Sequence, residues 1–303
     1  MHKPLDDNKK AYFHLPGLFE FYELYKIFLP LFRDHREYFY DWCEIGSIYG
    51  APADCLWGGG RVEGKNQDAS QVFALTDAFG ISARLTFSNS LLTEESLSDK
   101  KCNRLCRQLS RSGKNGVIVY SDLLLEYLQE NYPDLYFVSS TTKVLTNWKD
   151  FTAELDRDSF RYVVPDFRLN KQFEKLKALP NFQKNKIEFL CNECCDFSCT
   201  DRKECYKDVS RMNLGVIASP HICPHLNSNS GYSFAKAMEN PGFISTDQII
   251  NIYMPMGFSN FKLEGRGLGS AMVLEFLLYY MVKPQYQIHV REALYLDCML
   301  DLF

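Results

Sequence analysis

The strongest constraint on the fold of this chain is an alternation of short apolar segments with segments of helical periodicity. Seven segments of seven or eight residues have the β-branched and aromatic composition of buried strands, at 43–50, 81–87, 115–121, 134–140, 161–167, 186–192 and 259–265. The segments between most of them carry apolar residues at i, i+3 and i+4, and two of these, 121–133 and 169–180, end at a proline. This order predicts a parallel sheet with right-handed crossovers.

The number of predicted strands favours a closed barrel over a smaller open sheet. An eighth strand is expected either near 214–217 or in the aromatic N-terminal segment, which would complete a (β/α)8, TIM-barrel-like α/β fold. An open doubly wound sheet is the alternative. The 303 residues are 46% hydrophobic and show no internal repeat or linker, so we expect a single domain over residues 1–303. In such a barrel the chemistry collects in loops after the C-terminal ends of the strands.

Charge and hydropathy restrict the binding partners and the cellular location that the sequence predicts. The formal net charge of −4 gives no overall basic field, so the net charge does not support nucleic acid as a partner. The N-terminal segment lacks the uninterrupted apolar run of a secretory signal, and we therefore expect a cytoplasmic protein. The most apolar segment, 270–282, is shorter than the roughly 20 residues of a membrane span and contains Glu275, so it predicts a buried helix.

Cysteine is concentrated after the sixth predicted strand. Five of the eleven cysteines lie within residues 191–205, spaced Cys-x2-Cys-Cys-x3-Cys-x5-Cys, and Cys223 follows between His221 and His225. We expect this cysteine-rich loop, 191–225, at the C-terminal face of the strands. Zinc and iron–sulfur centres both need such a set of soft thiolate ligands. One crowded loop plus a distant cysteine favours an iron–sulfur cluster over the paired knuckles of a zinc site.

The same thiols have a second interpretation, because free cysteines are often small buried apolar residues. We favour that interpretation for the isolated cysteines, which are Cys43, Cys55, Cys102, Cys106 and Cys298.

Polar residues at the ends of other predicted strands are candidate catalytic groups. Glu264 and Arg266 close the last strand, where they could bind a substrate, although a structural ion pair is an equal alternative. Asp122 and Asp166 follow the strands at 115–121 and 161–167 and could act as acid and base. Capping of the next helix is the alternative role for both carboxylates.

Several segments resemble the collagenase-like peptidase family, peptidase family U-thirty-two, whose relatives include iron–sulfur hydroxylases of RNA bases and of the ubiquinone ring. FKLEGR at 261–266 is similar to the family's FKIEGR signature. Residues 115–147, RYVVPDFRLN at 161–170 and EFLCNECCDFSC at 188–199 resemble further family segments in the family order. The resemblance covers about residues 44–280 and implies a (β/α)8 barrel.

The resemblance implies an iron–sulfur protein, with a 4Fe-4S cluster favoured and zinc as the alternative. Because the cysteine spacings differ from those of the family's hydroxylases, the ligand set is our own expectation: Cys191, Cys195, Cys199 and Cys223, with Cys205 and Cys194 in reserve. The expected function is oxygen-independent, hydroxylase-like chemistry on a small molecule or modified biopolymer, with a possible electron-donor protein. The alternatives are an atypical or metal-dependent peptidase, and a non-catalytic binding protein with a structural metal site.

Overall fold

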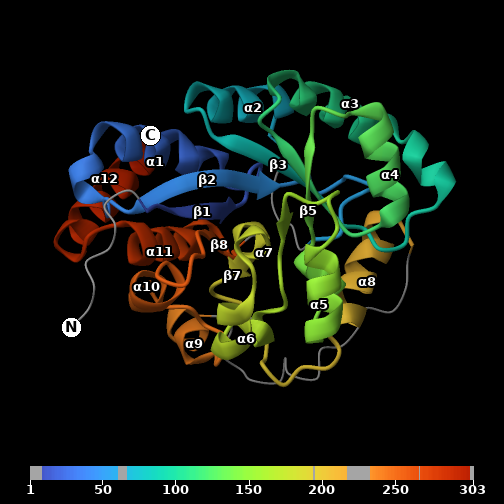
Figure 1. Ribbon diagram of the computed structural model, residues 1–303. Coiled ribbons are helices and arrows are strands. Elements are labelled where there is room, and N and C mark those ends of the chain that lie inside the picture. The colour runs from blue at the N-terminus through green and yellow to red at the C-terminus, as the bar shows by residue number, and fades with distance from the viewer. Residues whose placement is uncertain (1–8, 61–66, 194, 217–232, 266, 301–303) are drawn as a thin grey trace.

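Eight parallel strands form a nearly closed barrel in the computed structural model, which describes residues 9–60, 67–193, 195–216, 233–265 and 267–300 (Figure 1). The strands pair in the order β6-β5-β4-β3-β2-β1-β8-β7. A parallel bridge between Val163 and Ile187 joins the two ends of this sheet. The strands are β1 Ala11–Pro16, β2 Cys43–Gly50, β3 Ser82–Phe87, β4 Gly116–Val119, β5 Tyr136–Ser139, β6 Tyr162–Val163, β7 Glu188–Leu190 and β8 Asn260–Lys262. The predicted TIM-barrel-like α/β fold is confirmed.

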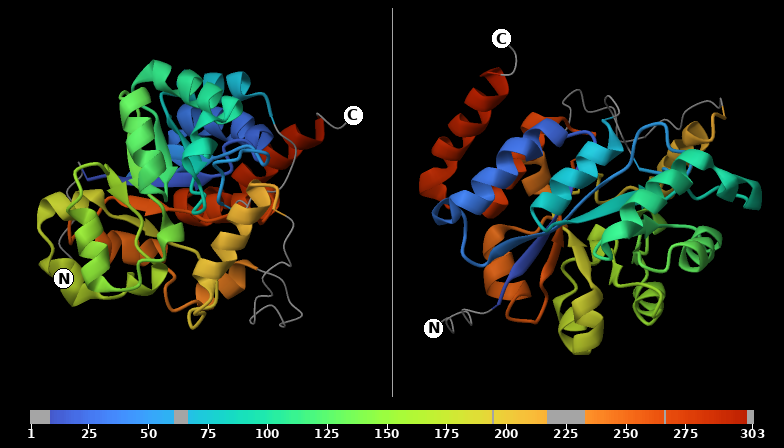
Figure 2. Two further views of the ribbon diagram at one scale, coloured as in Figure 1. Left: turned by 90° about the vertical axis from the view of Figure 1, so that its right-hand side faces the viewer. Right: turned by 90° about the horizontal axis from the view of Figure 1, so that it is seen from above.

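Helices surround the barrel (Figures 1 and 2). They are α1 Tyr22–Asp34, α2 Ala69–Ala78, α3 Lys100–Leu109, α4 Asp122–Asn131, α5 Trp148–Leu155, α6 Phe173–Ala178, α7 Asn181–Lys186, α8 Arg202–Asn213, α9 Phe234–Glu239, α10 Thr246–Gln248, α11 Ser270–Met281 and α12 Gln287–Leu300. The predicted helix at 270–282 is α11, whose Val273, Phe276 and Leu277 are buried. Among the described residues no helix has both the length and the apolar character that a membrane span requires.

The eighth strand lies in the N-terminal segment, as one of the two predictions had it. β1 pairs with β2 on one side and with β8 on the other, which closes that part of the barrel. The alternative position near 214–217 is wrong for residues 214–216, because Leu214 caps the C-terminal end of α8 and the next two residues lie in no strand. Residue 217 lies outside the described residues.

The strand predicted at 161–167 is shorter than expected. Only Tyr162 and Val163 pair in β6. Pro165 has no N–H to donate to a ladder, and the next residue, Asp166, accepts a hydrogen bond from the backbone N–H of Arg168 and so begins a 3₁₀ turn.

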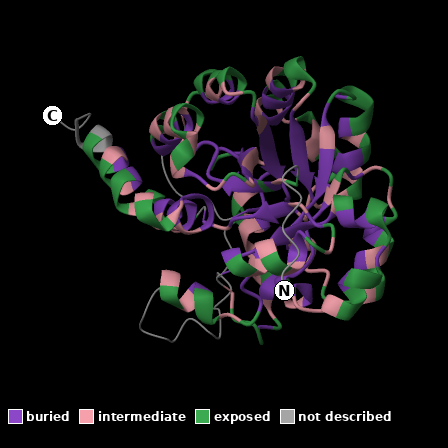
Figure 3. Ribbon diagram, turned by 60° about the vertical axis from the view of Figure 1, so that its left-hand side comes forward, coloured by how far each residue is buried: buried purple, intermediate pink, exposed green. Residues whose placement is uncertain are grey.

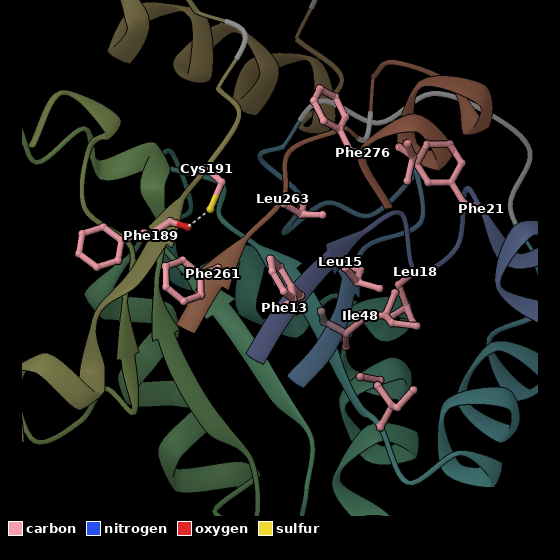
Figure 4. Packing of buried hydrophobic residues seen from close by; sticks show 14 of the residues in the cluster. Phe13, Leu15, Leu18, Phe21, Ile48, Phe189, Cys191, Phe261, Leu263 and Phe276 are labelled. Atoms are coloured by element: carbon pink, nitrogen blue, oxygen red, sulfur yellow. Dashed lines mark hydrogen bonds between the residues drawn. The ribbon is translucent and has the colours of Figure 1, made fainter. Parts of the chain in front are cut away.

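The strands are largely buried (Figure 3), and alternation along each strand divides its side chains between two environments. Figure 4 shows part of the outer one. Outward-facing residues such as Phe13, Leu85 and Phe261 form one large apolar cluster with the helices. The inner face holds a small apolar cluster of Tyr49, Ile118, Val138, Val164 and Leu190. The inner face also carries charged side chains, and these lead to the candidate site.

Candidate functional site

A small pocket lies inside the C-terminal end of the barrel, the end at which a TIM barrel carries its chemistry. Its volume is about 20 Å³, room for one water-sized group. We call it the mouth pocket. Its lining residues come from four strands, from the segments that follow β3, β5 and β8, and from α8: Tyr49, Thr86, Ser88, Ile118, Ser140, Thr141, Thr142, Tyr206, Lys262 and Glu264.

A buried ionic cluster forms the floor below this pocket. The carboxylate of Glu188 on β7 accepts hydrogen bonds from Arg84 Nη1 at 2.5 Å and from Lys262 Nζ at 3.1 Å. His14 Nε2 lies 3.5 Å from the same carboxylate. The Lys262 ammonium also lies 3.4 Å from the centre of the Tyr49 ring, a cation–π contact. All four ionisable side chains are almost completely buried, so each depends on these partners.

Burial and mutual charge fix the protonation of this cluster. Desolvation, assisted by the positive charge of Arg84, lowers the pKa of His14 from 6.5 to about 3, so the imidazole is neutral at pH 7. Burial alone would raise the pKa of Glu188, but the charges of Arg84 and Lys262 and the hydrogen bond from Arg84 hold it well below its usual value. The cluster therefore contains two basic side chains, those of Arg84 and Lys262, and one carboxylate.

The cysteine-rich loop is held by a second buried ionic cluster, centred on Arg202 at the start of α8. Arg202 Nη1 donates to Asp166 Oδ2 at 2.9 Å, and Arg202 Nη2 donates to the carboxylate of Glu193. Glu193 in turn accepts from the backbone N–H of Cys195 at 3.0 Å. Arg168 donates to the backbone carbonyl of Cys199 at 2.5 Å. The loops after β6 and β7 are thus tied to α8.

α8 covers the barrel mouth. Its Tyr206 lines the mouth pocket, and the carbonyl of Ser210 accepts from Asn89 Nδ2 at 3.1 Å. Asn213 at its end donates to the carbonyl of Cys55 at 3.0 Å. The segment that leads out of the cysteine-rich loop therefore forms part of the pocket wall.

The structure separates the three expected neighbouring ligands. Cys191 follows Leu190 of β7, and alternation turns its side chain outward, into the apolar cluster between strands and helices (Figure 4). There its thiol donates to the carbonyl of Phe189 at 3.5 Å, and burial raises its pKa. Cys195 and Cys199, by contrast, are neighbours in the loop, where burial, the charge of Glu193 and the nearby Cys199 raise the pKa of the Cys195 thiol.

The fit of these thiols to a cluster is partial. Within the described ranges, no group of three or more His, Cys, Asp or Glu side chains is arranged to hold a metal ion. Cys195 and Cys199 provide two adjacent soft ligands, and Cys205 lies on the first turns of α8. Cys194 and Cys223 lie outside the described residues. The predicted ligand set therefore stays a prediction.

The four candidate catalytic residues occupy different places. Glu264 lines the mouth pocket, and its backbone N–H donates to Asn192 Oδ1 at 2.7 Å. Asp166 is buried in the Arg202 cluster. Asp122 is exposed in the first turn of α4 and pairs with Arg157 at 2.7 Å, away from the residues that line the pocket. Arg266 lies outside the described residues.

Lys262, Thr86 and Ser88 were missed in the sequence, although period-two alternation contains a signal for them. Residues 260 and 262 share one face of β8, and residues 84 and 86 share one face of β3; residues 264 and 88 continue this period of two beyond the ends of the strands. Polar residues repeated on one face of an otherwise buried strand indicate a polar barrel interior. No sequence signal pairs Arg84 with Glu188, which are 104 residues apart.

No protein-family model matches the sequence, and no curated protein matches it. Among solved structures the chain is similar to the U32 peptidase Mk0906, with a TM-score of 0.48 and 15% identity over 88% of this chain and 96% of the other. It is also similar to the spore cortex-lytic enzyme SleL of Bacillus cereus, with a TM-score of 0.39 and 10% identity over 90% of this chain and 75% of that one. The first of these proteins bears the name of the family that the sequence resembles. Neither likeness bears on the reaction.

Proposed function

We propose that this protein is an iron–sulfur enzyme of the collagenase-like peptidase family, with hydroxylase-like chemistry on a small molecule or modified biopolymer bound at the mouth pocket. The observation that carries the proposal is the link between the cysteine-rich loop and the mouth pocket. Cys195 and Cys199 lie in the loop that leads into α8, and Tyr206 of α8 lines the same pocket as Lys262 and Glu264.

The ligand set in this proposal starts from the two thiols that are neighbours in the cysteine-rich loop. Cys195 and Cys199 supply two ligands, and the others come from Cys194, Cys205 and Cys223. Cys191 is a packing residue in this proposal, because its side chain lies in the apolar cluster. A bound cluster would supply electron transfer.

The protein's own residues bind and orient the substrate. Lys262 presents an ammonium that Glu188 and the Tyr49 ring hold in place. Glu264 lies two residues nearer the rim on the same strand face and can accept a hydrogen bond from a substrate hydroxyl or amine. Tyr206 and α8 limit the access of water to the pocket.

The test is metal analysis of protein purified without oxygen. Iron and acid-labile sulfide in comparable amounts, with absorbance near 400 nm, are the expected result. Cys195→Ser and Cys199→Ser should each lose most of the iron, whereas Cys191→Ser should retain it. Full iron in the Cys195 and Cys199 variants would contradict this ligand set. Zinc without iron or sulfide would instead support the structural metal site of a binding protein.

Peptide hydrolysis is the second candidate, since hydroxyls of Ser140, Thr141 and Thr142 lie in the same pocket as Lys262. Serine–lysine hydrolases use the neutral amine as a base. Here the Glu188 carboxylate and the Tyr49 ring both favour the charged ammonium, which opposes that role. Cleavage of a general peptide library that is lost in Lys262→Met would favour the peptidase over the hydroxylase.

A further inference from the structure

Three buried hydroxyls face the mouth pocket without a protein partner. They are Thr86 Oγ1, Ser88 Oγ and Thr141 Oγ1, and within the part of the chain that the structure describes none of them has a hydrogen bond. Thr86 and Ser88 are 3% and 1% exposed, and all three residues line the pocket. Buried polar groups are nearly always hydrogen-bonded in folded proteins, so these hydroxyls indicate a polar group that binds between them.

The charge at the floor of the pocket indicates the sign of that group. Glu188 contacts both Arg84 and Lys262, and His14 beside it is neutral. The charges of these four side chains therefore sum to one positive charge, and Lys262 lines the pocket. The Glu264 carboxylate lies nearer the rim, where its side chain is only partly buried and water screens its charge.

We infer that the mouth pocket binds the oxyanion end of a substrate, a carboxylate or a phosphate group. Lys262 supplies the charge, and the hydroxyls of Thr86, Ser88 and Thr141 donate to the anion's oxygens in charge-assisted hydrogen bonds. The pocket has room for one water-sized group, so an oxygen of the anion enters it and the rest of the substrate extends past Glu264 toward the rim. This inference rests on the proposed function for the place of the substrate and adds its chemical class.

The test measures stabilisation of the full-length protein by inorganic phosphate and by acetate, each compared with chloride at equal ionic strength. A ligand that binds only the folded state raises the Tm in a saturable manner. We expect saturation with at least one of the two anions. Acetate alone would identify a carboxylate, and phosphate alone a phosphate group. Equal behaviour of both anions and chloride would overturn the inference.

Variants assign the binding to this pocket. Lys262→Met should abolish the saturable shift, and Lys283→Met, which removes a surface lysine paired with Asp41, should leave it unchanged. The double variant Thr86→Val with Ser88→Ala removes two hydroxyls and no charge, so it should fold without a loss of stability and bind the anion at least tenfold more weakly. An unchanged apparent Kd in this double variant would overturn the inference.

The same measurement in the Cys195→Ser variant separates this inference from the proposed function. Saturable anion binding by the Cys195→Ser protein supports an oxyanion site in the mouth pocket, whatever the metal analysis finds. If neither this variant nor the unaltered protein binds the anion saturably, the oxyanion site is refuted even where iron and sulfide are present.

Discussion

At the residue scale, His14 is unusual because the fold buries its imidazole next to two basic side chains, those of Arg84 and Lys262. Its ring nitrogens lie 2.8 Å from Ser47 Oγ and 3.3 Å from Asn260 Oδ1, so the neutral ring has partners on both sides. Arg84 and Lys262 oppose a further positive charge, while Glu188 favours it. Burial decides the balance, and the pKa falls to about 3.

This shift predicts a specific loss of stability in acid. Between pH 6.5 and about 3 the unfolded state binds a proton at His14 and the folded state does not, so stability is complete above pH 6.5 and falls as the pH is lowered. The expected slope is about 1.4 kcal/mol per pH unit. Below its unfolded pKa of 4.5, Glu188 adds a loss of the same sign. Urea unfolding at several pH values measures the slope.

The control is a matched pair of histidine variants. His14→Gln should flatten the dependence of the free energy of unfolding on pH between pH 6.5 and 5. His289→Gln, at an exposed position on α12, should keep the dependence of the unaltered protein. An unchanged slope in His14→Gln would show that the imidazole titrates normally in the folded protein.

At the element scale, the Arg202 cluster fixes the conformation of the cysteine-rich loop. One guanidinium serves the carboxylates of Asp166 and Glu193, and all three side chains are buried. We expect Arg202→Met to cost about 3–5 kcal/mol, because it leaves buried carboxylates short of a partner. Hydrogen exchange at the Cys195 and Cys199 amides should accelerate most. Lys207→Met on the same helix removes an exposed pair with Glu204 and should change stability by less than about 1 kcal/mol.

The same elements show how far the sequence predicts this structure. Local patterns predict the seven strands and, from FKLEGR, a strand that ends at the barrel mouth. Strand alternation predicts that the side chain of Cys191 points outward, but only once the bounds of β7 are known. In the sequence alone, the even spacing of Cys191, Cys195 and Cys199 suggests instead that the three thiols share one site. In the Arg202 cluster, a side chain of α8 pairs with Asp166, which follows β6, and with Glu193, which follows β7. No local sequence pattern predicts these pairings.

At the scale of the whole molecule, the barrel has a weak seam. β1 and β2 pair over six positions, β5 and β6 over two, and within the described residues β6 meets the start of β7 at the single bridge between Val163 and Ile187. Few ladder hydrogen bonds cross this seam, so we expect native-state hydrogen exchange to be faster for amides of β6 than for those of β2.

The Arg202 cluster spans that seam at the C-terminal end, since Asp166 follows β6 and Glu193 follows β7. Val163→Ala should cost about 2 kcal/mol of stability through lost burial, as should Val117→Ala, its matched outward-facing counterpart on β4. If the bridge and the ion cluster hold one seam together, Val163→Ala and Arg202→Met should couple by about 1 kcal/mol in a double-mutant cycle. Val117→Ala and Arg202→Met should be additive. Additivity in both cycles would mean that the ion cluster supports the cysteine-rich loop alone and contributes nothing to barrel closure.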